Sequence, residues 1–314
     1  MRYYFAPLEG LTDSIYRQVH SHFFPGLDRY YTPFFSPTIH RTLTNREQRE
    51  LPFADAVPYC VVPQILTKIP EDFLWMAQQC AERGYREVNL NLGCPSGTVT
   101  AKGKGAAMLA APEALDRFLE EVFSKVKVDV SIKTRIGYNT SDEFSRLLEI
   151  FNRYPVCELT VHPRVRTAFY HDPMEPEVLR YAVENSRAPV CINGNLCTLT
   201  DVRNAAEAYP KAEAVMLGRG LIGDPGMFSP GGTDVKTLKA FMDTLLDAYI
   251  EAFGGARNAM FRLKENWYYL LCRFENSEKL GKRLRKTTDL EEFRRITEEI
   301  FGTLPLADCL HPCW

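Results

Sequence analysis

Short runs of β-branched and aromatic residues alternate with longer stretches of helical periodicity as far as residue 218, and this alternation limits the possible folds. The runs lie at residues 3–6, 29–33, 60–66, 87–91, 129–133, 158–162, 189–193 and 214–218. The helical stretches lie between most of them, at residues 70–83, 112–125, 141–153, 176–185 and 200–209. Such alternation predicts parallel strands joined by crossover helices.

Eight strand-and-helix units within about 225 residues favour a closed (β/α)8 barrel, the TIM barrel, over an open sheet. The alternative is a doubly wound α/β sheet, in which a glycine-rich turn follows the first strand. The segment Ala6-Pro7-Leu8-Glu9-Gly10 has no such turn. We therefore predict an α/β fold of the TIM-barrel type.

The pattern changes after residue 218. Pro225, Pro230, Gly231 and Gly232 interrupt the chain, and residues 235–302 show only helical periods. Proline and glycine clusters of this kind mark connections between domains. We expect a barrel domain over residues 1–230 and a smaller all-helical domain over residues 231–314.

Net charge and hydropathy limit the partners and the cellular location that we expect for this chain. With 38 basic and 40 acidic residues the net charge is −2, so a polyanionic partner needs a local basic patch. The N-terminus lacks the pattern of a secretory signal, and no apolar stretch approaches the ~18 residues that span a bilayer. We expect a cytoplasmic, monomeric protein without a membrane partner.

The nine cysteines are an odd number and include no CxxC pair, so we expect thiols rather than disulfides. The C-terminal tail offers Cys309, His311 and Cys313 as three potential metal ligands. A structural zinc site normally needs a fourth ligand. We therefore expect no metal.

Polar residues close several of the predicted strands, at the end of a barrel where active sites lie. Gln64, Lys133 and His162 converge from the third, fifth and sixth predicted strands. An amide offers both a donor and an acceptor, as the edge of a flavin or uracil ring requires. The lysine either stabilises negative charge on such a ring or extends to water.

Asn193-Gly194 and Gly218-Arg219 follow the seventh and eighth predicted strands. Taken alone, each is a turn. Many barrels, however, bind phosphate with backbone N–H groups at these two positions, and an arginine adds a bidentate donor. The sequence leaves both interpretations open.

Cys94 lies directly after a predicted strand, between Gly93 and Pro95, where a loop containing three glycines begins. A buried cysteine is usually an inert small apolar residue. A thiol at the base of a glycine-rich loop over the barrel mouth can instead reach a substrate when the loop closes. We favour the second interpretation for this cysteine.

Six segments together resemble the tRNA-dihydrouridine synthases. They are APLEGLTD at 6–13, NLGCP at 91–95, GKGAAML at 103–109, KTRIG at 133–137, NG at 193–194 and LGRG at 217–220. The resemblance implies an FMN-dependent enzyme that reduces the C5=C6 bond of uridine in tRNA, with NADPH as the reductant of the flavin. It also implies that Cys94 is the general acid that protonates C5, after a hydride has reached C6.

The resemblance implies further site residues. Those for the cofactor are Pro7, Leu8, Glu9, Gln64, Lys133, His162, Asn193, Gly194, Asn195, Gly218 and Arg219. Those for the base and the tRNA are Asn91, Arg262 and Lys264. We also expect Arg135 at the substrate site and, because RNA phosphates need cations, Lys102 and Lys104 of the loop after Cys94 as tRNA contacts.

Residues 257–286 contain nine basic and three acidic residues, within a protein whose net charge is −2. The cluster is either a solvated helix face or a surface for phosphates. Its aromatic residues, Phe261 and Trp267 among them, could stack on bases or form a core. An FMN barrel that acts on a free pyrimidine remains the alternative, and such an enzyme should lack this basic appendage.

Overall fold

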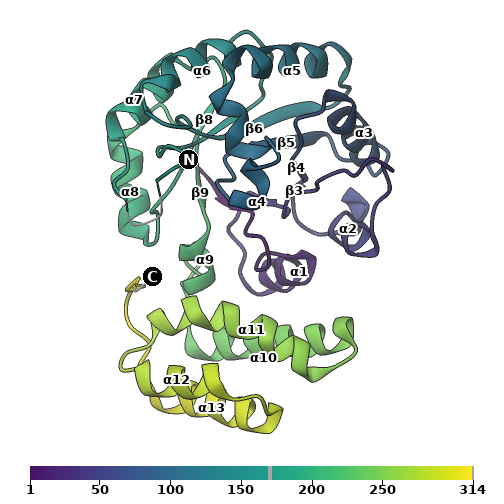
Figure 1. Cartoon of the computed structure of the whole chain (residues 1–314). Coiled ribbons are helices and arrows are strands. Elements are labelled where there is room, and N and C mark those ends of the chain that lie inside the picture. Colours follow the sequence, from purple (N-terminus) through teal and green to yellow (C-terminus); the bar gives the residue numbers. More distant parts are fainter. Residues whose placement is uncertain (169–171, 313–314) are drawn as a thin grey trace. The chain divides into compact units, whose positions relative to one another are not determined.

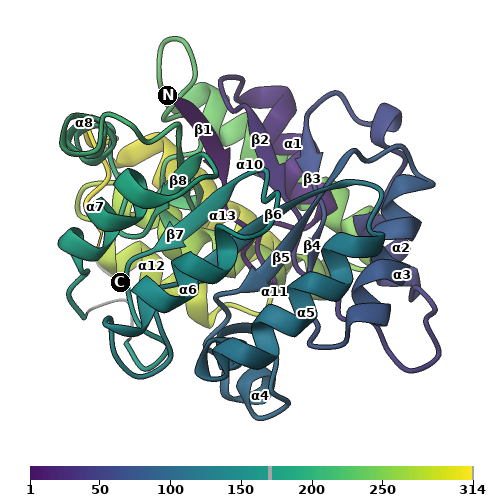
Figure 2. The same cartoon turned by 90° about the horizontal axis from the view of Figure 1, so that it is seen from above.

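The computed structural model describes residues 1–168 and 172–312. Its sheet is wholly parallel and forms a barrel with helices outside (Figure 2). The strands are β1 Arg2–Phe5, β2 Arg29–Tyr31, β3 Val61–Val62, β4 Gln64–Ile65, β5 Glu87–Leu92, β6 Asp129–Arg135, β7 Leu159–His162, β8 Val190–Asn193 and β9 Ala214–Leu217. The predicted TIM-barrel fold is confirmed.

The sheet has nine strands rather than the eight expected, because the run 60–66 is divided at Pro63. The strand order is β3-β2-β1-β9-β8-β7-β6-β5-β4, so its two edges are consecutive parts of one run. Thr32 donates its backbone N–H to Val62 on one side, and Asn89 donates to the Pro63 carbonyl on the other. Proline has no N–H to donate, which is why the ladder breaks there while the barrel still closes.

The five predicted crossover helices are all present. They are α3 Pro70–Ala81, α5 Pro112–Lys125, α6 Glu143–Phe151, α7 Pro176–Asn185 and α8 Leu199–Ala208. Three of them begin with proline, whose fixed φ suits the first helical turn. The apolar face of α5, with Phe118, Leu119 and Val122, is buried, as its period predicts.

The shorter elements were not predicted from the sequence. They are α1 Ser14–Phe23, α2 Asn45–Glu50, α4 Gly97–Thr100, α9 Arg219–Gly223 and the 3-10 turns Ala54–Ala56, Gly105–Ala110 and Leu271–Arg273. Asp13 caps α1 by accepting from the backbone N–H of Tyr16 at 3.0 Å.

Two compact units emerge from the packing, and neither is one continuous segment. The first comprises residues 1–7, 28–195 and 203–216 and contains the barrel; the second comprises residues 8–27, 196–202 and 217–314. The division into domains over 1–230 and 231–314 stays a prediction.

The second unit is helical. Its long helices are α10 Val235–Phe253, α11 Ala256–Leu270, α12 Glu278–Lys286 and α13 Leu290–Thr303 (Figure 1). Trp267 of α11 is 1% exposed and packs on Phe274 and Phe301, with ring centroids 6.5 and 5.4 Å away. Trp267 is therefore a core residue, which settles one of the alternatives left open by the sequence.

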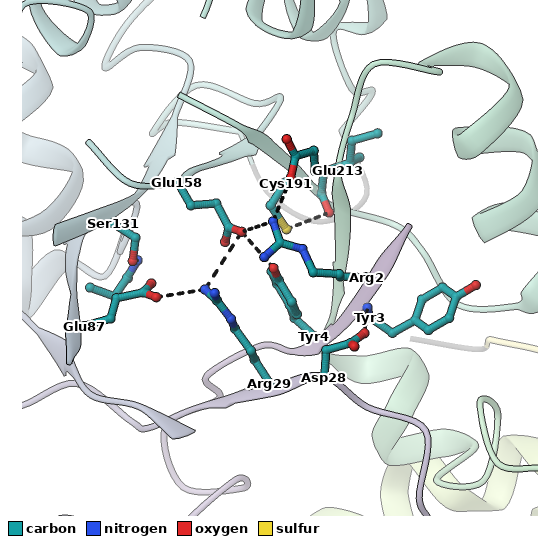
Figure 3. A network of polar contacts seen from close by, with 12 residues as sticks. Arg2, Tyr3, Tyr4, Asp28, Arg29, Glu87, Ser131, Glu158, Cys191 and Glu213 are labelled. Carbon is teal, nitrogen blue, oxygen red and sulfur yellow. Dashed lines mark hydrogen bonds and ion pairs between the residues drawn. The ribbon is translucent and has the colours of Figure 1, made fainter. Parts of the chain in front are cut away.

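A network of charged residues lies where the strands begin, at the opposite end of the barrel from the polar strand ends (Figure 3). Glu158 is 2% exposed and accepts from the Tyr4 hydroxyl at 2.8 Å and from Arg2 at 3.3 Å. Arg29 lies 2.9 Å from Glu87 and 4.0 Å from Glu158. Burial raises the pKa of the Glu158 carboxyl above its usual value, so the two arginines stabilise a charge that the site itself disfavours.

No helix in the described part of the chain is long and apolar enough to cross a bilayer.

Candidate functional site

Lys133 of β6 and Asn193 of β8 meet inside the barrel near the carboxyl ends of their strands. The ammonium lies 2.8 Å from the Asn193 side-chain oxygen, and the Asn193 amide nitrogen donates to the Met216 carbonyl at 2.7 Å. This second bond fixes which end of the amide faces the lysine. Burial, followed by the nearby Arg135 cation, lowers the pKa of Lys133 to about 8. The lysine is therefore partly neutral near physiological pH.

We expect Lys133 to make the stability of the protein depend on pH in the alkaline range. Its pKa is about 8 when folded and about 10.4 in an unfolded chain, so between these values the unfolded state binds more protons. The contribution of this group to the free energy of unfolding should therefore increase as the pH rises. By pH 10 the increase should amount to about 2 kcal/mol. Denaturant unfolding of wild type and Lys133→Met across this range measures it. Parallel curves would contradict the shifted pKa.

A chain of side-chain amides crosses three strands beside this lysine. Asn89 donates to the Ser131 hydroxyl at 2.9 Å, Gln64 donates to Asn89 at 2.8 Å, and Asn91 donates to Gln64 at 2.7 Å. Gln64 is 1% exposed, and its oxygen and nitrogen both bond within the protein. Its role as a direct ligand of a ring edge stays a prediction.

The amide chain ends at Cys94. The Asn91 side-chain oxygen accepts from the backbone N–H groups of Gly93 at 3.0 Å and Cys94 at 2.9 Å. Such an asparagine turn holds the backbone that follows β5. The loop then returns, because Ala106 donates its N–H to the Cys94 carbonyl at 3.1 Å. A Cβ at Gly105 would lie 2.9 Å from that carbonyl, so only glycine fits there at φ +61°.

The roles expected for Asn91 and Arg135 can be compared with their contacts. Asn91 positions the turn before Cys94, and its expected contact with the uracil base stays a prediction. Arg135 is 3% exposed and donates to three backbone carbonyls, those of Gly93 at 3.1 Å, Val165 at 2.6 Å and Ala168 at 2.9 Å. Its guanidinium thus holds the loops around the thiol together.

The two lysines of the loop after Cys94 differ. Lys102 is exposed, whereas Lys104 is half-buried and donates to the Ser36 hydroxyl at 2.9 Å. Burial lowers the pKa of Lys104. Lys102 is the better placed of the two for a contact with an external phosphate.

His162 ends β7, and Arg164, two residues further along the chain, determines the tautomer of its neutral ring. Arg164 is 1% exposed and lies 3.0 Å from His162 Nε2. A guanidinium can only donate, so Nε2 must be the acceptor and the ring proton of neutral His162 lies on Nδ1. Arg164 also bonds to Asn195 at 3.3 Å and to the Asp172 carbonyl at 2.8 Å.

The turn after β8 packs against this histidine. Gly194 has φ +119°, and a Cβ there would lie 2.8 Å from His162 Cδ2. Asn195 also has a positive φ, of 47°. Two consecutive positive φ values are typical of a tight turn, and glycine and asparagine are the residues that tolerate them.

The remaining cofactor candidates Leu8, Glu9, Gly218 and Arg219 belong to the second unit. Leu8 donates its N–H to the Thr12 hydroxyl at 2.8 Å, which fixes the turn after β1, and Glu9 is exposed. Pro7 is half-buried in the first unit. Gly218 precedes α9, and Arg219 is its first residue.

Arg262 and Lys264, expected to contact tRNA, make bonds inside the helical unit. Arg262 donates to the Gly10 carbonyl and lies 3.8 Å from Asp13. Lys264 donates to the Thr287 carbonyl and, at 3.2 Å, to that of Arg285, both at the end of α12. Replacing either residue would disturb this unit, so a role in RNA binding is tested better elsewhere.

Exposed cations are available on α12. Its exposed basic residues are Lys279, Lys282, Arg285 and Lys286. In the described chain none of these four forms an ion pair, whereas Arg283 pairs with Glu299 at 2.9 Å. Charges without a partner on the protein are available to phosphates.

The structure describes only part of the C-terminal tail that contains Cys309, His311 and Cys313. Cys309 lies 3.9 Å from His311, and Cys313 lies outside the described residues. Within the described ranges no three His, Cys, Asp or Glu side chains gather closely enough to hold a metal ion.

Comparison with known proteins gives consistent matches. A family model described as dihydrouridine synthase (Dus) matches residues 4–300. tRNA-dihydrouridine synthase B of Pasteurella multocida (strain Pm70) is 27% identical over 229 residues, which cover 72% of this chain and 68% of that protein. A probable tRNA-dihydrouridine synthase of Staphylococcus aureus (strain Mu50) is 26% identical over 306 residues, covering 94% and 91%. Probable tRNA-dihydrouridine synthase 2 of Bacillus subtilis (strain 168) is 26% identical over 312 residues, covering 94% and 92%.

Among solved structures, a variant of NCR from Zymomonas mobilis matches with a TM-score of 0.49 and 13% identity, covering 71% of this chain and 83% of that one. The family match is much broader, since it extends through most of the barrel and the helical region. The chain belongs to the dihydrouridine synthase family.

Proposed function

We propose that this protein reduces the C5=C6 bond of uridine in tRNA to 5,6-dihydrouridine, with FMN as its cofactor and NADPH as the reductant. The supporting observations are the family and the names of the relatives, which are tRNA-dihydrouridine synthases. The observation within this chain that carries the proposal is the position of Cys94. Asn91 holds its backbone at the end of β5, and Lys133 lies opposite Asn91 in the register of the neighbouring strand.

The donors present in the chain fit a flavin nucleotide. A ring with a polar edge needs donors, and the Lys133 ammonium has N–H groups beyond the one bonded to Asn193. A phosphate needs backbone N–H groups and a cation, and we propose that the turn at Gly194 and Asn195 supplies backbone N–H groups of this kind. Gly218 and Arg219 are proposed as the further phosphate ligands, and Pro7, Leu8 and Glu9 as the backbone beside the ring.

When bound, FMN would supply the hydride that is added to C6 of the uracil. The chain itself must supply the proton at C5, and we assign it to the Cys94 thiol. Asn91 keeps the backbone N–H groups of Gly93 and Cys94 turned inward, which fixes where the thiol can reach. His162, with Nε2 occupied by Arg164, can offer only Nδ1–H to a ligand while it is neutral.

We expect the purified protein to bind FMN without a covalent link and to release it intact on denaturation. Arg219→Ala should weaken this binding by about 1–3 kcal/mol, the loss typical of a charge-assisted contact. Titration of the flavin-free protein with FMN, followed by flavin fluorescence, measures both affinities. Folded wild-type protein that binds no FMN would overturn the cofactor assignment.

The activity itself is tested with unmodified tRNA transcripts, NADPH and the FMN-loaded protein. Dihydrouridine in the tRNA, detected by mass spectrometry of its nucleosides, supports the proposal. Free uridine and uracil are offered in parallel. Reduction of the free pyrimidine alone would instead support the small-molecule alternative.

A further inference from the structure

The turn between α10 and α11 carries a shallow, open pocket of about 500 Å³. Its lining residues are Phe253, Asn258, Phe261, Arg262 and Glu265. All five belong to the helical unit, and four of them lie along one face of α11, at a spacing of three or four residues. Arg262 is held there by Gly10 and Asp13, so this wall of the pocket is fixed.

Two cations lie over the exposed aromatic ring of Phe261. The ring is 43% exposed, and the Lys264 ammonium lies 4.9 Å from its centroid and the Arg257 guanidinium 5.9 Å. A base that stacks on the ring beneath Arg257 displaces this exposed guanidinium, which is then available to a phosphate. Single-stranded nucleic acids bind to surfaces that combine an aromatic ring with cations, because their bases stack on the ring and their phosphates contact the cations.

Glu265 adds an exposed carboxylate to this pocket. It is one of three acidic residues in the basic segment 257–286, and no ion pair involves it within the described ranges. A carboxylate repels phosphate, so a nucleotide bound beside it must bring N–H donors. The Watson–Crick edge of guanine presents N1–H and the N2 amino group side by side, which match the two carboxylate oxygens. Adenine presents an acceptor next to one amino group and matches less well.

We propose that this pocket binds one unpaired guanine of an RNA strand, stacked on Phe261, with Glu265 accepting from its Watson–Crick edge. The exposed Asn258 amide provides a further donor and acceptor, and Arg257 meets the adjoining phosphate. That the RNA is tRNA rests on the proposed function. The preference for guanine rests on the pocket alone.

The direct test measures binding of two fluorescein-labelled oligonucleotides, UUGUU and UUAUU, to the FMN-loaded full-length protein by anisotropy. Wild type should bind the guanine oligonucleotide more tightly, and Glu265→Gln should remove that preference. Phe261→Ala should weaken binding by about 5- to 100-fold, as loss of one stacked base does, and Phe261→Trp should restore it. The matched control is Tyr268→Ala, which removes another exposed aromatic side chain of α11.

Three results would overturn the pocket: equal affinity of wild type for the two oligonucleotides, unchanged binding by Phe261→Ala, or equal losses in Phe261→Ala and Tyr268→Ala. A second measurement uses tRNA at several salt concentrations. Phe261→Ala should weaken binding without changing the salt slope, since stacking releases no counterions, whereas Arg257→Ala should reduce that slope by about 0.7–0.9. If wild type forms no dihydrouridine but still prefers guanine, the proposed function fails and the pocket stands. The reverse result leaves the reaction intact and rejects the pocket.

Discussion

Cys94→Ala should leave reduction of the bound flavin by NADPH unchanged while slowing reduction of tRNA about 10²- to 10⁴-fold. The reason is that a positioned general acid contributes a factor of this size, and only the second half-reaction needs a proton at C5. Rapid mixing separates the two halves, because flavin absorbance reports first the reduction by NADPH and then the reoxidation by tRNA.

Cys60→Ala is the matched control, since this thiol is exposed and Cys60 is not among the proposed cofactor or tRNA ligands. It should behave as wild type in both halves. Equal slowing of the two half-reactions in Cys94→Ala would assign that thiol a structural role. A reoxidation rate unchanged from wild type would place the proton donor elsewhere.

Arg29→Met should destabilise the barrel by about 3–5 kcal/mol at pH 7, the cost of removing one member of a buried ion pair. The substitution keeps most of the side-chain volume but leaves Glu87 and Glu158 facing each other without the cation between them. Their side chains are only 15% and 3% exposed, so water cannot replace the lost partner well. Unfolding in denaturant measures the loss.

The loss should shrink as the pH falls. Without Arg29 the folded-state pKa of Glu158 rises further above its unfolded value, so protonation favours the folded state and the deficit present at pH 7 recovers in acid. Arg2→Met is the control. Its side chain is 37% exposed, and we expect a loss of about 1 kcal/mol or less. Equal losses of stability in Arg29→Met and Arg2→Met would show that the buried ion pairs of Arg29 contribute no more than an exposed ion pair.

The fold could be predicted from sequence because its signals are local. Helical periods and initial prolines place α5 and α7 at the predicted bounds, and each predicted strand is found. The division at Pro63 shows where local reasoning stops. A proline within a strand signals a break in the ladder, but only the pairing of Val62 with β2 and of Gln64 with β5 shows that the break is also where the barrel closes.

The candidate site was predicted in part, for the same reason. Strand ends point to Lys133, His162 and Cys94, because in a barrel all of them face one end. Arg164 lies only two residues beyond His162, but the sequence does not show that its side chain turns back onto the ring and bonds to Nε2. Likewise, the sequence alone does not show what a basic residue on a helix contacts. Its charge can contact a phosphate or, as Lys264 does, two carbonyls of a neighbouring helix.

The row of amides that ends at Cys94 has a direction, and it contains no group that gains or loses a proton between acid and alkaline pH. Ser131, Asn89, Gln64 and Asn91 each donate to or accept from the next, so turning one amide over would set two acceptors or two donors against each other at a neighbour. The geometry around the thiol is thus independent of pH, whereas burial lowers the pKa of the neighbouring Lys133 to about 8. A pH profile of this enzyme should therefore report the charge of its reacting groups, and not a rearrangement of the scaffold that carries them.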